Sequence, residues 1–203
     1  IAAANEPRAG EIKDIAEEEG VDFIIGSTED VLDRYYQVAT TYNPDYVVRV
    51  TSDCPLIDSR LIDEIIEMVE LNNLDYGSNT LIELFPDGQD IEVFRYSTLK
   101  KAWKKSNLPS EREHVTPFIK KNCDFNKGDL FKAKNYYSER NYNNVRMTVD
   151  EPIDLDAITR ITKNLGTDKD WLTYTNFIIE NYKEFKNQGI IRNEGYLKSL
   201  KSD

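Results

Sequence analysis

Two aspartates of this sequence follow apolar segments in the same local pattern. Asp53 comes after residues 46–50 and lies two positions before Pro55, and Asp150 comes after residues 145–149 in the same relation to Pro152. Short β-branched runs of this kind are typical of buried strands. In open α/β sheets, ligands bind just beyond the carboxyl ends of the strands. Two carboxylates from neighbouring strands can therefore converge there on one hard cation such as Mg²⁺.

Each aspartate on its own is also explained by a different structure. An Asp-x-Pro turn is a common way to begin a helix, and such a turn needs no ligand. A single instance is weak evidence for chemistry, whereas two instances in one α/β chain favour a shared metal site. Both interpretations stay open at the level of the sequence.

Length and charge restrict the classes of protein to which the chain can belong. Its 203 residues are enough for one sizeable core. The formal net charge of −11 argues against binding to nucleic acid or to an anionic membrane surface, because both require a basic face. A small anionic ligand remains compatible with this charge, since a few arginines and lysines can line a pocket.

Cysteine and histidine usage excludes several kinds of site. The two cysteines, Cys54 and Cys123, are too few for a disulfide framework and fit a reducing compartment, so we expect a cytoplasmic protein. Neither lies in a zinc-binding pattern. His114 is the only histidine, which excludes sites built on several histidines. No apolar run reaches membrane-spanning length, and no signal peptide is visible.

The first part of the chain alternates between strand and helix patterns, which predicts a doubly wound, mostly parallel sheet. A helix is expected to end at Gly20, and the acidic Ser27–Asp30 segment is typical of a helix start. Strands are predicted at residues 1–4, 21–25 and 46–50, and helices at 9–19, from about 31 to 42, and at 59–71.

The second part has a less regular pattern. Residues 136–144 are polar and rich in tyrosine, which predicts an exposed loop. The aromatic stripe within residues 171–182 indicates core packing or a dimer face. Strands are predicted at residues 75–78, 90–96 and 145–149, and helices at 97–106, 110–121, 153–164 and 168–186.

Five segments, taken together and in order, give a specific resemblance. They are residues 26–36, 49–58, 85–94, 110–117 and 148–152. As a set they resemble the cytidylyltransferases of spore-coat and surface polysaccharide biosynthesis, relatives of the enzymes that make CMP-activated Kdo and sialic acids. The resemblance covers about residues 1–165, which we expect to form a nucleotidyltransferase domain, with residues 166–203 as a C-terminal helical extension.

The resemblance implies a fold, a reaction and a set of site residues. The fold is the three-layer Rossmann-like nucleotide-diphospho-sugar transferase fold, and the reaction couples CTP to an acidic sugar with release of pyrophosphate. Asp53 and Asp150 would be catalytic and would bind Mg²⁺, while Gly26, Ser27 and Asp30 would lie near the cytosine. A homodimer is also expected.

Further residues would face the acceptor sugar. The resemblance assigns the segment that faces the sugar to residues that include Asn79, Asp87, Gly88, Asp90 and Glu92. For each of these residues taken alone, a polar turn or a half-buried strand is the favoured explanation. Arg112 could pair with a sugar carboxylate through its planar fork. His114 is either a hydrogen-bonding group or base, or a structural histidine. Arg49 is expected to brace Asp53 or a phosphate, or to pair with a neighbour.

The sequence departs from the family at its beginning. The Gly/Arg/Lys-rich loop that grips the triphosphate has no counterpart, and the first residues resemble the second strand of the family, so we expect the first strand to be missing. Two alternatives to a cytidylyltransferase therefore stay open. One is a non-catalytic homologue that serves as a binding or oligomerisation module. The other is a glycosyltransferase, although its usual Asp-x-Asp motif is absent around Asp53.

Overall fold

The computed structural model describes residues 1–190 and 192–203, which divide into two compact units of interleaved segments. The first unit contains residues 1–47, 95–131 and 193–203, and the second contains residues 48–94 and 132–192. Within the described residues, no helix is both long and apolar enough to cross a membrane.

The first unit begins with a parallel pair of short strands. β1 (Ala2–Ala4) pairs with β2 (Ile24–Gly26), and α1 (Ala9–Glu18) connects them. Gly20 follows α1 with φ of 67°, the left-handed conformation expected after a helix end. The helix α2 (Val31–Tyr42) starts at Asp30, whose carboxylate accepts a hydrogen bond from the Asp33 N–H at 2.8 Å.

Helices complete the first unit around α2. They are α4 (Tyr96–Lys105), α5 (Pro109–His114), α6 (Pro117–Asn122), the 3₁₀ helix η1 (Asp124–Asn126) and α9 (Glu194–Ser199). α4 and α5 pack against α2, and α9 packs against α5. The C-terminal Asp203 carboxylate accepts hydrogen bonds from the backbone N–H and the hydroxyl of Ser110, at 2.9 and 2.6 Å.

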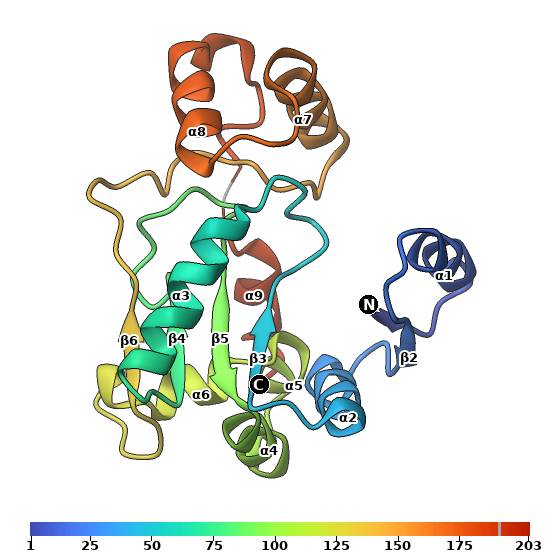
Figure 1. The fold of residues 1–203 in the computed structure, drawn as a ribbon, viewed down its shortest axis with the longest axis vertical. Coiled ribbons are helices and arrows are strands. Elements are labelled where there is room, and N and C mark those ends of the chain that lie inside the picture. The colour runs from blue at the N-terminus through green and yellow to red at the C-terminus, as the bar shows by residue number, and fades with distance from the viewer. Residues whose placement is uncertain (191) are drawn as a thin grey trace. The chain divides into compact units, whose positions relative to one another are not determined.

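A four-stranded sheet has the order β3 (Tyr46–Arg49), β5 (Glu92–Arg95), β4 (Tyr76–Ser78) and β6 (Ala133–Asn135). β4 runs parallel to β6 and antiparallel to β5. The sheet that was predicted to be mostly parallel therefore contains an antiparallel pair of strands. The helix α3 (Ser59–Leu71) lies against β4 (Figure 1). A Cβ on Gly77 would approach Val69 Cγ2 to 2.3 Å, so glycine in β4 permits this close packing.

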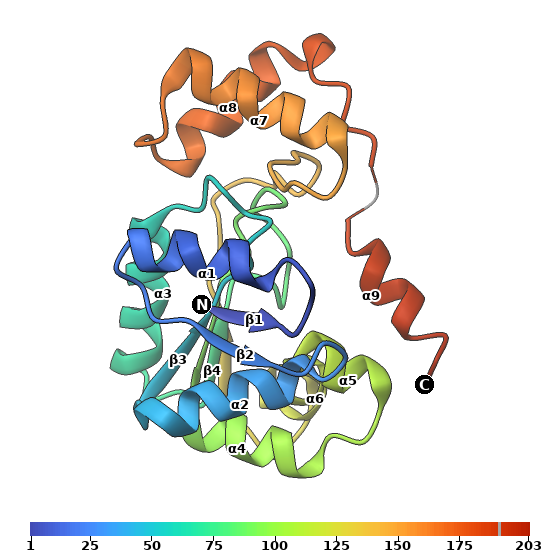
Figure 2. The same cartoon turned by 90° about the vertical axis from the view of Figure 1, so that its right-hand side faces the viewer.

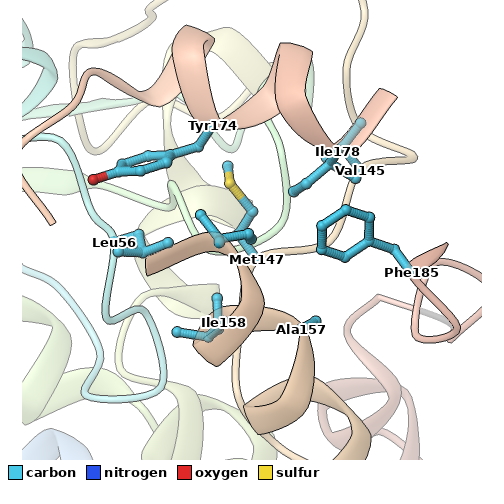
Figure 3. Close-up of a cluster of buried hydrophobic side chains, with 9 residues drawn as sticks. Leu56, Val145, Met147, Ala157, Ile158, Tyr174, Ile178 and Phe185 are labelled. Atoms are coloured by element: carbon cyan, nitrogen blue, oxygen red, sulfur yellow. The ribbon is translucent and has the colours of Figure 1, made fainter. Parts of the chain in front are cut away.

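The second unit also contains a helical pair. α7 (Pro152–Leu165) and α8 (Trp171–Glu180) lie side by side, as Figure 2 shows, and the 3₁₀ helix η2 (Tyr182–Glu184) follows. Their facing side chains form an apolar core with Leu56, Val145 and Met147, drawn in Figure 3. Its buried members are Leu56, Val145, Met147, Ala157, Ile158, Ile161, Tyr174, Ile178 and Phe185. The aromatic stripe on α8 is thus partly core, while Leu172, Ile179 and Tyr182 are exposed.

Most predicted elements are confirmed, with four corrections. Residues 145–149 do not form a regular strand, and only Arg146 makes a parallel bridge, with Asp87. The partner segment turns at once, because Gly88 has φ of 104°, so the ladder cannot continue. The predicted strand 21–25 is shorter and shifted, at Ile24–Gly26. The predicted helix 168–186 ends earlier, at Glu180.

The fourth correction concerns residues 110–121, which form two helices instead of one. Val115 has φ of 70° and ψ of −54°, and the Thr116 N–H donates to the His114 carbonyl at 2.8 Å. This geometry is a γ-turn of the rare, strained kind, which is unusual for a β-branched residue. Pro117 then begins α6 at a position where its missing N–H costs nothing.

Candidate active site

A buried arginine, Arg146, connects the candidate site residues of the second unit. Its Nε and Nη2 donate to the two carboxylate oxygens of Asp154 at 2.9 and 2.7 Å. Its Nη1 donates to Asp87 Oδ2 at 2.9 Å, and Nη2 also donates to Asp150 Oδ2 at 2.6 Å. The side chain is only 6% exposed. One guanidinium therefore fixes three carboxylates in a defined arrangement.

The chain's later part holds Arg146 in place. The Arg146 N–H donates to Gln188 Oε1 at 2.9 Å, and Gln188 Nε2 donates to the Arg146 carbonyl at 3.0 Å. Asn187 Nδ2 donates to Asp154 Oδ1 at 2.9 Å. Sequence reasoning missed Arg146, Asp154, Asn187 and Gln188. The one local signal was the spacing of Arg146 and Asp150, four residues apart, with a charged residue inside an apolar run.

The ionisation of this network follows from burial and hydrogen bonding. Burial alone would raise the pKa of Asp154, but the hydrogen bonds from Arg146 and Asn187 outweigh it and hold that pKa well below its ordinary value. The hydrogen bonds that Arg146 donates to Asp154 and Asp150 raise the pKa of Arg146 further, against the effect of desolvation. Burial raises the pKa of Asp87, although Arg192 and Arg146 oppose this.

The two predicted metal ligands lie on adjacent pieces of backbone. The Val149 N–H donates to the Asp53 carbonyl at 2.8 Å, which brings the segment ending in Asp150 next to Asp53. The Cys54 thiol, whose pKa is raised by burial, donates to Asp53 Oδ1 at 3.5 Å. Among the described residues, no hydrogen bond reaches Asp53 Oδ2 or Asp150 Oδ1, so each carboxylate keeps one oxygen for another partner.

These donors suit one kind of metal. Mg²⁺ is usually held by one or two protein carboxylates, with water and substrate phosphates completing its octahedron. Within the described part of the chain, no group of three or more His, Cys, Asp or Glu side chains could hold a metal ion. Asp53 and Asp150 therefore fit a cation that is shared with a phosphate ligand, and they do not form a cage made of protein alone.

A turn beside Arg146 carries three of the predicted sugar-facing residues. Besides its bond to Arg146, Asp87 lies 3.7 Å from Arg192 Nε, and Arg192 Nη2 also pairs with Asp90. Gly88 is required at this turn, because an added Cβ would lie 2.8 Å from the Met147 carbonyl carbon. Asp87, Gly88 and Asp90 therefore lie in one turn, where Arg146 and Arg192 pair with the two carboxylates. Their contact with an acceptor sugar stays a prediction.

Asn79 and Glu92 are committed to the protein's own groups. Asn79 donates through Nδ2 to the Gln89 carbonyl at 2.6 Å and accepts through Oδ1 from the Ile91 N–H at 2.9 Å. Glu92 is 2% exposed and accepts hydrogen bonds from Arg49 Nη1 at 2.8 Å and from the Tyr76 hydroxyl at 2.7 Å. The geometry gives Asn79 a bracing role, and it pairs Arg49 with a neighbour.

The first unit carries the remaining predicted residues. Ser27 Oγ accepts from the Asp30 N–H at 3.0 Å, and the Asp30 carboxylate is paired with the Nε and Nη2 groups of Arg112, the former at 2.9 Å. Arg112 Nη1 donates to the Trp103 carbonyl at 2.8 Å. Three of the five N–H groups of Arg112 are thus engaged, and the other two make no hydrogen bond with the residues that the structure describes. A Cβ on Gly26 would lie 2.9 Å from Arg34 Cγ, so glycine lets the backbone pass close to α2.

His114 lies directly before the strained turn. Its ring packs edge-on against Tyr196 at 5.1 Å between centroids, and its Nε2 lies 3.7 Å from Glu113 Oε2. The structure therefore gives His114 a packing contact within its unit, between α5 and α9. Strained backbone of this kind persists only where the surroundings impose it, and it often marks a functional position.

Strands and helices in this order fit a Rossmann-like α/β fold. Comparison with known proteins agrees, because the structure of a cytidylyltransferase from Leptospira borgpetersenii superposes with a TM-score of 0.84 at 32% identity, covering 93% of this chain and 79% of that one. The chain belongs to the cytidylyltransferase family, whose model matches residues 9–193.

Two curated proteins are also similar to the chain. An uncharacterized protein of Methanocaldococcus jannaschii is 37% identical over 145 residues, which is 71% of this chain. The spore coat polysaccharide biosynthesis protein SpsF of Bacillus subtilis is 29% identical over 143 residues, which is 70% of this chain. In each case the matched part spans 57% of the relative's own length.

Proposed function

We propose that the protein couples CTP to an acidic sugar and releases pyrophosphate, giving a CMP-sugar for surface polysaccharide biosynthesis. The observation that carries the proposal is the placement of Asp150. Arg146 holds one of its oxygens at 2.6 Å, while the Val149–Asp53 backbone bond brings Asp53 alongside. Membership of the cytidylyltransferase family and the similarity to SpsF support the same reaction class.

In the proposed reaction, a hydroxyl oxygen of the sugar attacks the α-phosphorus of CTP. The bond from that phosphorus to the bridging oxygen breaks, pyrophosphate leaves with its electron pair, and the hydroxyl proton passes to solvent. Mg²⁺ held by Asp53 and Asp150 would neutralise the phosphate oxygens when bound. Because nothing covalent is asked of the protein, rate enhancement comes from positioning and electrostatics.

The chain's own residues supply the positioning. Arg146 keeps the Asp150 carboxylate in one orientation and prevents it from turning away from Asp53. In the first unit, Ser27 accepts the Asp30 N–H and retains its own hydroxyl hydrogen as a donor for the edge of a cytosine base. Arg112 holds Asp30 and is proposed as a positioning residue for this helix start, with two N–H groups left for an acidic sugar.

Pyrophosphate release by the full-length gene product tests the proposal. CTP, UTP and ATP are each supplied with Mg²⁺ and a panel of acidic sugars, and the expected result is release that depends on CTP and on one of the sugars. Equal rates with all three nucleotides would contradict the proposed selectivity. No release with any pair would favour a non-catalytic module. Light scattering on the same preparation measures whether the protein is the homodimer that we also propose.

A matched pair of variants tests the role of the Asp150 carboxylate. Asp150→Asn keeps the size of the side chain but removes its charge, and turnover is expected to fall by about 100-fold or more, as for loss of one major electrostatic group. Asp63→Asn makes the same change at an exposed position of α3 and should leave the rate unaltered. Equal rates for both variants would remove Asp150 from the mechanism.

A further inference from the structure

The second unit contains a pocket of about 510 Å³ that includes none of the candidate active-site residues. It is formed by α3, by residues 136–142, by Phe85 and by the first half of α8. Its volume lies within the range that binds small organic ligands in proteins. Segments from four parts of the sequence therefore meet around a space large enough for one or two sugar rings.

Aromatic side chains that hold one another in place form one wall of this pocket. Trp171 makes edge-on contacts with Phe85 and Tyr142, at 4.9 and 5.5 Å between ring centroids. Phe85 also contacts Tyr136 at 6.1 Å. Tyr136, Tyr142 and Trp171 remain partly exposed. Such a wall offers fixed apolar surface to the C–H face of a ring-shaped ligand.

Polar groups of both hydrogen-bonding kinds line the rest of the pocket. Glu64 accepts the Tyr136 hydroxyl at 2.8 Å, and burial together with this bond raises the pKa of Tyr136 to about 12. Three side-chain groups of the lining make no hydrogen bond with the part of the chain that the structure describes. They are the guanidinium of Arg140, the amide of Asn176 and the indole N–H of Trp171. The pocket thus presents donors and acceptors that are ready for hydroxyl groups, each of which both donates and accepts.

The charge of the lining discriminates between ligand classes. The charged groups of the lining are two carboxylates, Glu64 and Glu139, and one guanidinium, Arg140. A nucleotide or phosphosugar would bring further negative charge to this site, and the whole chain already has a formal charge of −11. An uncharged polyhydroxylated ring meets no such repulsion and can use both kinds of polar group.

We propose that this aromatic-walled pocket binds a neutral saccharide, separately from the nucleotidyl-transfer site. The aromatic rings would stack against the apolar face of the sugar, while Arg140, Asn176 and the glutamates would contact its hydroxyls. The proposal uses only contacts within the second unit and does not depend on CTP as the nucleotide.

Saturation-transfer NMR with neutral methyl glycosides tests this proposal on the full chain. Methyl glycosides of glucose, galactose, N-acetylglucosamine and rhamnose are titrated singly, and at least one is expected to bind. Tyr137→Ala and Asn176→Ala both change exposed residues, so these variants should fold. Each should weaken binding by about fivefold to tenfold, the loss expected for one ring or polar contact. Tyr182→Ala removes an equally exposed tyrosine outside the pocket and should change binding less than twofold.

The possible outcomes separate the alternatives. Glycoside binding that survives Asp150→Asn but weakens in Tyr137→Ala supports a separate saccharide pocket. Binding that is lost in Asp150→Asn and unchanged in Tyr137→Ala would overturn it, because the sugar would then occupy the transfer site. Absence of binding by all four glycosides would also overturn the proposal. So would the finding that CMP binds to the pocket around Tyr137 more tightly than any glycoside does. A change in molecular mass by light scattering in Tyr137→Ala would instead assign the pocket to a second copy of the chain.

Discussion

Two parallel hydrogen bonds, at 2.9 and 2.7 Å, join the guanidinium of Arg146 to the carboxylate of Asp154 in the interior of the second unit. Asp154 has no exposed side-chain surface and Arg146 is 6% exposed. Neither charge could be buried alone at acceptable cost, so each stabilises the ionised form of the other. Because Arg146 also holds Asp150 and Asp87, this pair is the support on which the candidate active site rests.

Removing the partner of Arg146 should destabilise the fold strongly. Asp154→Ala leaves a buried guanidinium without its main counter-charge, and the free energy of unfolding is expected to fall by about 3–5 kcal/mol. Urea denaturation followed by circular dichroism measures this. Asp156→Ala, at an exposed position of the same helix, should change it by less than about 0.5 kcal/mol. Similar losses in both variants would mean that helix propensity, and not the pair, determines the effect.

The same pair should make stability sensitive to acid. The pKa of Asp154 is lower in the folded chain than in the unfolded chain, so its contribution is complete above the unfolded value of about 4 and is lost as the pH falls below it. The pKa of Asp87 is raised in the folded chain, so its effect has the opposite sign. Its contribution to the stability of the fold is lost as the pH rises above about 4. Urea titrations between pH 2.5 and 7 should show an acid-labile component that is absent from Asp154→Asn. An unchanged pH profile in that variant would contradict the assignment.

Gly88 should tolerate no side chain. Its φ of 104° and the 2.8 Å approach of an added Cβ to the Met147 carbonyl carbon predict that Gly88→Ala costs at least about 1–3 kcal/mol. Gly10→Ala is the matched control, because Gly10 lies in α1 with no atom within 4 Å of an added Cβ. That change should stabilise the chain by about 0.5–1 kcal/mol. Thermal denaturation of both variants gives the comparison, and equal shifts would mean that the turn at Gly88 relaxes freely.

The pairing of Arg112 with Asp30 should depend on the planar fork of arginine. Lysine keeps the charge but cannot bond through two nitrogens, so Arg112→Lys is expected to lower stability by about 1 kcal/mol. Arg8 makes a similar two-point contact with Glu11, but both side chains are mostly exposed, so Arg8→Lys should have no measurable effect. Urea denaturation of the two variants measures the difference. A larger loss from Arg8→Lys would show that burial does not decide the strength of these pairs.

Much of the fold was predictable because hydrophobic periodicity and capping residues are local signals. The helices α1, α2, α3 and α7 and the strands β1 and β3 lie where the sequence indicated them. The errors have non-local causes. Residues 145–149 have the composition of a strand, yet their partner segment bends away at Gly88. The break at Val115 has no sequence signal before Pro117, since a β-branched residue is among the least expected at positive φ.

The candidate site was predictable only in part, for the same physical reason. Asp53 and Asp150 stood out because each follows an apolar segment and precedes a proline. The groups that orient Asp150 come from elsewhere, and Gln188 reaches Arg146 from 42 residues away. Asn79 and Arg112 were expected to face the substrate, yet neighbouring groups in the folded chain use the amide of the first and three N–H groups of the second. Residue type alone does not reveal how much of a polar side chain is already engaged.

The hydrogen bonds that join Asn187 to Asp154 and Gln188 to Arg146 have a consequence for synthesis on the ribosome. During translation, Arg146 and its three carboxylates emerge well before residues 187 and 188, and they remain incompletely bonded until that later stretch leaves the exit tunnel. A nascent chain stalled before Asn187 would hold a half-finished polar core and be a good substrate for quality-control proteases. The emergence of residues 187 and 188 would therefore be the step that completes the bonding of the Arg146–Asp154 pair.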